Sequence, residues 1–513
     1  MRPRLLGTLV LALLLPLTGV APAAARGPTV YGALKSLQST AAAGSETAEA
    51  LSADASTYTA ALSAVKRLSG TRRAELASVI TNIQQIAAAH GFTPSRLPAL
   101  FLTLEHNTQR WTSEPLLAAD QRVSFPGSHI IWEYYPGQGI EIQWLATFGE
   151  ANSYYLQGHE NTQLSELLNE VIPLATQRAG GIAWEYMFHF DGGVPPWTSG
   201  LSQGTALQAL ARAYSRLKTP AYLTAAQQAL KLFQTPPPEG VRVATPAGAT
   251  YLEYTYAPQE HIINGFIQSL NGLYDYAKLT GDPLGRQLFE AGDAEARVEL
   301  PHYNTGAWSM YDQHSESNLN YHELLTEFLE DLCKRTDEGP PVPAPTPATA
   351  SPKAATPTPP GAGEVATTAT GGATAQASSA SAGTGSATAI PGDSIYCTTA
   401  QSFTADLHTP PAISLITTKL PARARGGVQL SLSKIATVSL TVSRGGRVVW
   451  TNGALVERGK PRLLWITPAQ TGTYGIALRA TDLAGNSTST SGTITVAAPP
   501  SARPSPPKAK RGH

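Results

Sequence analysis

The strongest constraint on the fold is a helical spacing of apolar residues that recurs between Pro28 and Asp337. Apolar side chains return there every three or four positions, which places them on one face of a helix. Short connections that contain Gly or Pro separate these stripes, which favours antiparallel helical hairpins packed side by side. The clearest stripes are Leu76/Val79/Ile80/Ile83/Ile86, Leu207/Leu210/Ala211/Tyr214/Leu217, Ile263/Phe266/Ile267/Leu270/Tyr274 and Leu325/Phe328/Leu329/Leu332.

Two stretches within this region, residues 124–142 and 181–191, depart from the helical spacing. They combine aromatic and β-branched residues with Gly and Pro breaks, a composition typical of strands. In the second stretch, Glu185 and His189 would fall on the same face of a strand, as half-exposure requires. The sequence therefore predicts a mainly α domain over residues 28–337 with a small β element.

A low-complexity stretch, residues 338–394, interrupts the chain after this region. It consists almost entirely of Pro, Ala, Thr, Gly and Ser. Such a composition cannot bury enough apolar surface to offset the entropy lost on ordering, so we expect a disordered insertion. Residues 498–513 have a similar composition with added Lys and Arg, and we expect a disordered basic tail.

The two cysteines of the chain flank the insertion. Cys333 ends an apolar stripe, Cys397 opens another, and neither has the spacing of a metal-ligand motif. We favour a disulfide between them over two free thiols. Residues 395–411 again have helical spacing, and one isolated helix of this length would be marginal in water. We therefore expect this segment to be the last helix of the α domain, attached by the disulfide.

Residues 412–497 change character again. Val438–Val442 alternates between apolar and polar residues, and Arg444–Arg447 has the composition of a turn. Short strands at even spacing are typical of a small immunoglobulin-like (Ig-like) β-sandwich, which resembles the accessory modules of secreted bacterial proteins.

The beginning of the chain predicts export. Arg2 and Arg4 precede an apolar run, and Ala21–Ala25 offers small residues for cleavage. This pattern is typical of a secretory signal peptide over residues 1–25, and the run is too short for a stable membrane span. We expect a secreted or extracytoplasmic protein with no membrane span; attachment to the cell envelope is possible for such a chain.

Charge argues against one class of partner. Lys+Arg and Asp+Glu both number 37, whereas proteins that bind nucleic acid through counterion release carry a basic excess. We therefore predict no nucleic-acid partner. The sequence contains no P-loop, HExxH or dinucleotide fingerprint in a credible setting. Gly200–Gly204 spells GxSxG, but Pro195-Pro196 stands where the strand of a nucleophile elbow would be.

Several segments near the later helices carry a family resemblance. Residues 197–204 (WTSGLSQG) and 263–275 (INGFIQSLNGLYD) resemble the C-terminal domain of D-glucuronyl C5-epimerases. The resemblance is clearest over residues 180–335 and extends weakly upstream through Tyr135. It implies an (α/α) toroid of antiparallel helical hairpins. Together with the C-terminal β-sandwich, this completes the predicted fold.

The activity implied by the resemblance is inversion of C5 in a glucuronate-type residue of a polysaccharide. Inversion needs proton carriers on opposite faces of the ring and a group that stabilises the enolate-like intermediate. No cofactor is required. By resemblance, Tyr254, Tyr311 and Tyr321 would serve proton transfer and substrate positioning. Glu253 would orient them or act as a further acid or base.

A tyrosine base at neutral pH requires a large electrostatic effect. Its pKa of ~10 must fall by about 3 units, which corresponds to roughly 4 kcal/mol. Cationic groups and hydrogen bonds nearby would have to supply this.

Five further residues are candidates for substrate binding. In the animal epimerases the Tyr-Asp segment runs on to an arginine that grips the uronate carboxylate, and His314 stands at that place here. His322 would bind substrate or tune Tyr321, and Trp197 would pack or stack on a sugar. Gln203 and Asn264 complete the set, with close helix packing as their alternative role.

Three other functions fit the same scaffold. A polysaccharide lyase shares the proton abstraction but expels the C4 oxygen. A glycoside hydrolase would use paired carboxylates, for which Glu185, Asp191 and Glu253 are available, although their spacing gives no support. A non-catalytic glycan-binding protein would retain only the aromatic cleft. If the protein is an epimerase, the expected partner is a uronate-containing glycan. The sequence does not indicate an oligomeric state.

Overall fold

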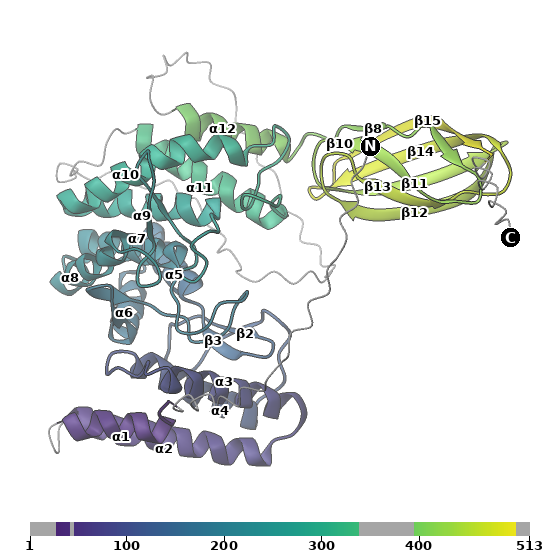
Figure 1. Ribbon diagram of the computed structural model, residues 1–513. Coiled ribbons are helices and arrows are strands. Elements are labelled where there is room, and N and C mark those ends of the chain that lie inside the picture. Colours follow the sequence, from purple (N-terminus) through teal and green to yellow (C-terminus); the bar gives the residue numbers. More distant parts are fainter. Residues whose placement is uncertain (1–26, 42–45, 338–393, 499–513) are drawn as a thin grey trace, which may run out of the picture.

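The computed structural model describes residues 27–41, 46–337 and 394–498, and these form a helical domain and a β domain (Figure 1). The predicted signal peptide, nearly all of the predicted insertion and the predicted basic tail lie outside the described residues. Among the described helices, none is both long and apolar enough to cross a membrane.

The helical domain begins with two hairpins that cover one end of the molecule. They consist of α1 (Val30–Thr40), α2 (Glu46–Arg67), α3 (Gly70–Ala88) and α4 (Leu97–Ser113). The predicted stripe of α3 is buried along its length, from Leu76 to Ile86. A three-stranded sheet of β1 (Arg122–Val123), β2 (Trp132–Tyr135) and β3 (Gly139–Ile142) packs against α3 and α4.

The remaining helices follow as antiparallel neighbours up to the opposite end (Figure 1). Helices α7 and α9 pack against each other at the centre of this group, and α5, α10 and α11 flank them. The elements are α5 (Trp144–Gln157), α6 (Asn161–Val171), α7 (Gly200–Leu217), α8 (Pro220–Ala229), α9 (Ile263–Thr280), α10 (Pro283–Glu299) and α11 (Leu319–Asp337), with small hairpins β4 (Thr176–Arg178)–β5 (Gly181–Ala183) and β6 (Arg242–Ala244)–β7 (Ala249–Tyr251). A helical domain followed by a β domain is as predicted; the closed toroid stays a prediction.

Glu185 differs from its expected position. Only residues 181–183 of the predicted 181–191 strand form a strand, and Glu185 is 2% exposed rather than half-exposed. Its carboxylate receives hydrogen bonds of 2.6 Å from both Arg96 and Arg178. Burial alone would raise the pKa of Glu185, but these two guanidinium groups lower it. Glu185 therefore joins the N-terminal hairpins to the centre of the domain and is not a surface residue.

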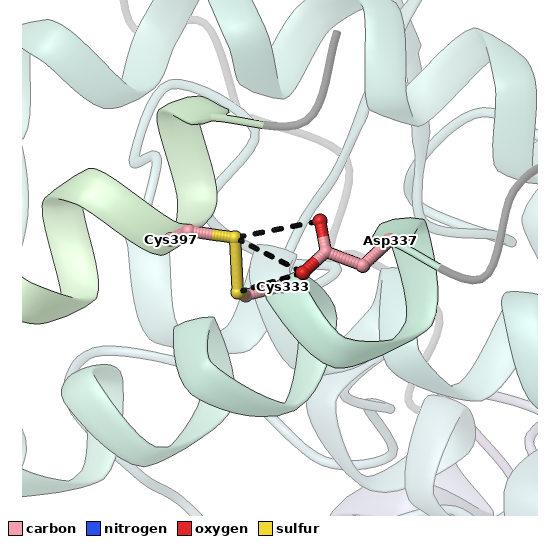
Figure 2. A group of neighbouring side chains, drawn as sticks. All are labelled: Cys333, Asp337 and Cys397. Carbon is pink, nitrogen blue, oxygen red and sulfur yellow. Dashed lines mark hydrogen bonds between the residues drawn. A yellow bond between two sulfur atoms is a disulfide. The ribbon is translucent and has the colours of Figure 1, made fainter. Parts of the chain in front are cut away.

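Helix α12 (Ser394–Asp406) lies against α11, and the disulfide between Cys333 and Cys397 joins the two. Figure 2 shows this bridge beside the carboxylate of Asp337, which lies 3.8 Å from Cys397 Sγ. Because both sulfurs are bonded to each other, this group offers no thiolate to a metal ion.

The β domain contains two sheets that share one apolar core. One has the strand order β13-β10-β8, from β13 (Arg462–Ile466), β10 (Arg425–Leu432) and β8 (Ile413–Leu415). The other has the order β12-β11-β14-β15-β9, from β12 (Arg447–Val456), β11 (Ala436–Arg444), β14 (Gly472–Asp482), β15 (Ser487–Ala497) and β9 (Lys419–Pro421). Alternate residues of β11 are buried, as its pattern predicts. The Ig-like β-sandwich stays a prediction, and the word sandwich is used below for this two-sheet domain.

The disulfide yields a stability prediction. It links residues 64 positions apart in the sequence, and bridges across long loops stabilise mainly by restricting the unfolded chain. Replacing both cysteines by serine should lower the free energy of unfolding by about 2–4 kcal/mol. Denaturant unfolding of the variant, and of the wild type with and without reductant, measures this. Equal stability of all three samples would contradict it.

Candidate active site

The segments that precede α7 and α9 meet at one end of these helices. The amide of Gly200 donates to the carbonyls of Leu252 and Glu253, at 3.0 and 3.2 Å. The amide of Thr255 donates to the carbonyl of Thr198 at 3.2 Å. These bonds place Trp197 and Glu253 side by side, although they are far apart in the sequence.

The loop that carries Tyr311 joins the same end. The amide of Ile263, the first residue of α9, donates to the carbonyl of Tyr311 at 3.2 Å. The Tyr311 and Tyr321 rings lie 4.7 Å apart, and the Tyr254 ring lies 5.7 Å from that of Trp197. The structure thus brings Tyr254, Tyr311 and Tyr321 into one cluster, within electrostatic reach of each other.

A small hollow opens beside Glu253 and Tyr254. Its walls are mainly aromatic, and they also include Gln143, Ser199 and Leu201. The segment between β5 and α7 supplies most of the aromatic wall, and the β2–β3 hairpin adds Tyr135. The lining residues are Tyr135, Gln143, Leu145, Tyr186, Phe188, Phe190, Trp197, Ser199, Leu201, Glu253 and Tyr254.

A second hollow lies between the loop after Tyr256 and the tip of the Tyr311 loop. It is lined by Ala257, Pro258, Gln259, Glu260, Gln313 and His314. Burial, and then the negative charges of Asp191 and Asp312, raise the pKa of Glu260, while His314 partly offsets this effect. Among the described residues, neither hollow is lined by Lys or Arg.

Glu253 is the ionisable group at the centre of the site. Its residue is 6% exposed, and its Oε2 atom has no hydrogen-bond partner. Gly265, in the first turn of α9, leaves room for this carboxylate, because a Cβ there would lie 2.6 Å from Oε2. Burial raises the pKa of Glu253 to about 8, with a smaller opposing effect from the Tyr254 hydroxyl. Glu253 therefore gains or loses a proton near neutral pH.

The pKa shifts of Tyr254 and Tyr311 are opposite to the shift that a tyrosine base requires. Burial, followed by the charge of Glu253, raises the pKa of both Tyr254 and Tyr311. In the part of the chain that the structure describes, no lysine or arginine lines the hollows to lower these pKa values. The condition for a tyrosine base, a lowered pKa, is therefore not met by Tyr254 and Tyr311 in the free protein. At neutral pH they are hydroxyl donors.

His322 is a core residue and not a substrate ligand. It is fully buried, and its ring stacks on that of Trp308 at 3.7 Å. Nε2 lies 3.0 Å from the carbonyl of Phe403, to which it can only donate, so Nδ1 accepts from the amide of Ser309 at 3.1 Å. Both nitrogens are thus satisfied within the protein. This correction gives His322 a structural role: it attaches the Tyr311 loop to α11 and α12.

Gln203 likewise belongs to the core. Its amide group bonds both the amide and the carbonyl of Trp184, at 3.4 and 3.0 Å. It is fully buried and outside both hollows, so substrate contact is not its role. Asn264 is 1% exposed and lines neither hollow, and neither atom of its amide group has a partner. Gln203 therefore has a packing role, which is the alternative that the sequence analysis gave for it.

Trp197 and His314 do line the hollows. The Trp197 ring stacks on that of Tyr186, with centroids 4.4 Å apart, and its Nε1 donates to the Phe188 carbonyl at 2.8 Å. It is therefore part of a packed aromatic wall. His314 is exposed at the second hollow.

Sequence reasoning missed most of the aromatic wall. Tyr135, Tyr186 and Phe190 come from the two stretches that we predicted as strands but to which we assigned no site role. The available signal was the density of aromatic residues in these stretches, with the weak upstream resemblance at Tyr135.

Comparison with known proteins finds that part of this chain is similar to the C-terminal part of carbohydrate epimerases. Residues 178–340 match the family model described as D-glucuronyl C5-epimerase C-terminus. A D-glucuronyl C5-epimerase of Caenorhabditis elegans is 34% identical over 131 residues, which are 23% of this chain and 21% of that protein. The resemblance to the D-glucuronyl C5-epimerase family is thus confirmed over the matched segment, which contains Glu253 and the three tyrosines.

Two more comparisons are weaker. An uncharacterized protein of Methanocaldococcus jannaschii is 27% identical over 172 residues, which are 32% of this chain and 56% of that protein. Among solved structures, an engineered protein matches 21% of this chain and 29% of its own, with 16% identity and a TM-score of 0.15, too low to support an argument. The chain thus spans about a fifth and just over half of the two curated relatives.

The burial of His322 yields a prediction on stability. Burial lowers its pKa to about 4, so between pH 6.5 and 4 the unfolded chain binds a proton that the folded chain does not. Stability from this group is present above pH 6.5 and is lost as the pH falls, by about 3 kcal/mol in all. The His322→Gln variant should lose less stability than the wild type between pH 7 and pH 4, as measured by denaturant unfolding. An identical pH dependence in both proteins would show the prediction to be wrong; the His314→Gln variant, changed at an exposed site, is the control.

Proposed function

We propose that this chain is a secreted C5-epimerase-like enzyme that inverts C5 of a glucuronate-type residue in a polysaccharide. The observation that carries the proposal is the buried carboxylate of Glu253, whose Oε2 has no hydrogen-bond partner, beside Tyr254 and Tyr311 within the segment that matches the epimerase family. Secretion is supported by the signal-like start of the sequence and by the disulfide, which suits an oxidising compartment.

In the proposed reaction, ionised Glu253 is the base. Its carboxylate takes the proton from C5, and the electron pair of the broken C–H bond moves into the enolate formed with the sugar carboxylate. Tyr311 then donates its hydroxyl proton to C5 from the opposite face, and the pair returns to form the new C–H bond. Tyr254 interacts with both Glu253 and Tyr311. Its hydroxyl would take the proton from Glu253 and pass its own proton to the Tyr311 phenolate. No atom is gained or lost over the cycle.

This assignment follows from the order of the pKa values. A base is most effective when its pKa lies near the working pH, which burial achieves for Glu253. Tyr254 and Tyr311, with raised pKa values, remain protonated and can act as acids and as hydrogen-bond donors to the enolate. A hydrolase would need a second carboxylate, and among the described residues Glu253 is the single carboxylate that lines the aromatic hollow.

Incorporation of deuterium at C5 tests the reaction. Incubation with heparosan-type and other uronate polymers in deuterated water should label C5 without breaking the chain. The Glu253→Gln, Tyr254→Phe and Tyr311→Phe variants should each lose about 10²–10⁴-fold in the rate of labelling. As controls, the Tyr31→Phe and Glu290→Gln variants are changed at exposed positions that line neither hollow. Both should incorporate deuterium at the wild-type rate.

Other outcomes identify other functions. An unsaturated uronate chromophore would show a lyase, and new reducing ends would show a hydrolase. Binding of the polymer without labelling, unaffected by the tyrosine variants, would show a glycan-binding protein.

The pH dependence of labelling tests the role of Glu253. Because the base must be ionised, the rate should fall about tenfold for each pH unit below its pKa, which burial raises to about 8, and should level off above it. A rate that is already constant from pH 5 to 8 would exclude Glu253 as the base.

A further inference from the structure

The β-sandwich contacts the loop that carries Tyr311. Arg458, in the turn between β12 and β13, donates from its backbone amide to Glu316 Oε2 at 3.2 Å. Its Nη2 lies 3.9 Å from the sulfur of Met310. One residue of the β domain therefore touches both Met310 and Glu316 on the loop of the helical domain.

Met310 and Glu316 form the base of the turn that presents Tyr311. They pair with each other as an antiparallel bridge. Between them, the Tyr311 amide donates to the Ser315 carbonyl at 2.9 Å, and Asp312 Oδ1 accepts from the amides of His314 and Ser315, both at 2.7 Å. A shift at the base of this short turn would displace Tyr311 and His314 together.

Glu316 depends on Arg458 for its charge balance. Burial raises the pKa of Glu316, and the amide and charge of Arg458 oppose this effect. Its second oxygen, Oε1, is buried without a partner. The backbone amide and the charge of Arg458 both stabilise the ionised form of this carboxylate, so the turn and the β domain are coupled at this contact.

A second β-domain residue holds the same loop near its beginning. Lys434 is 1% exposed, and its Nζ lies 2.7 Å from Asp482 and donates to the carbonyls of Asp406 and Thr409. Nζ also lies 5.0 Å from the ring centroid of Trp308, whose Nε1 donates to the Ser317 carbonyl at 2.8 Å. Lys434 thereby attaches the sandwich to the end of α12 and to the loop. Figure 1 shows the end of α12 next to the β domain.

We infer that the β domain is part of the active site's framework, with Arg458 as a positioning residue for Tyr311. The sandwich does not merely extend from the helical domain. It fixes the turn from Met310 to Glu316, and through it the orientation of the proposed acid. The inference on catalysis rests on the proposed epimerase function, whereas the inference on the position of the loop does not.

The test compares Arg458→Ala, Arg458→Lys and the control Arg447→Ala in the full chain. Arg447 is exposed at the start of β12, so its replacement should change nothing. Arg458→Ala should speed amide hydrogen exchange in residues 303–318 at least about tenfold without lowering the melting temperature of either domain. It should also lower kcat for C5 labelling by about 10–100-fold with little change in KM, because a misplaced acid affects chemistry more than binding. Arg458→Lys, which keeps the charge, should recover part of both effects.

A double-mutant cycle separates positioning from a general loss of stability. Arg458→Ala and Glu316→Gln should be non-additive in both measurements, because each removes the charge interaction between the Arg458 guanidinium and the Glu316 carboxylate, whereas the backbone amide of Arg458 is unchanged. Unchanged amide exchange in residues 303–318 would overturn the inference, even if the wild type has no epimerase activity. Faster exchange with an unchanged kcat in an active enzyme would overturn the catalytic part alone.

Discussion

The close contact between α7 and α9 is the constraint on which the site depends. A Cβ on Gly272 would lie 2.1 Å from the carbonyl oxygen of Gly204, and one on Gly200 would lie 2.3 Å from the carbonyl oxygen of Leu252. Only glycine permits this approach. Because the helices are so close, the segments that precede them run side by side and are joined by backbone hydrogen bonds. The position of Glu253 beside Trp197 follows from this packing.

The same packing explains the ionisation of Glu253. Gly265 lets the backbone of α9 approach the carboxylate, so the group loses water without gaining a charged partner. Burial of an unpaired carboxyl costs stability unless it is protonated. A structural role would favour a paired carboxylate, as at Glu185 between Arg96 and Arg178. An unpaired carboxylate at the edge of a hollow is better explained by function.

The sequence predicted elements whose evidence is local. The stripe from Leu76 to Ile86 is a buried helix face, and the alternation in β11 is a buried strand face. It did not predict contacts made by distant residues. Glu185 meets Arg96, 89 residues away, and His322 meets the carbonyl of Phe403, 81 residues away. The cluster of Glu253 and the tyrosines was accessible because a family resemblance, and not periodicity, pointed to these residues.

Among the described residues, no Lys or Arg lines either hollow, and this bears on how the proposed uronate substrate would bind. In the proposed reaction, neutral donors hold the sugar carboxylate. Tyr254 and Tyr311 would be such donors, because their raised pKa values keep the hydroxyls protonated at neutral pH. Burial therefore has two linked effects in the proposed reaction. It makes Glu253 a base that works near neutral pH, and it keeps the tyrosines protonated, able to stabilise the enolate through hydrogen bonds aimed at the developing charge.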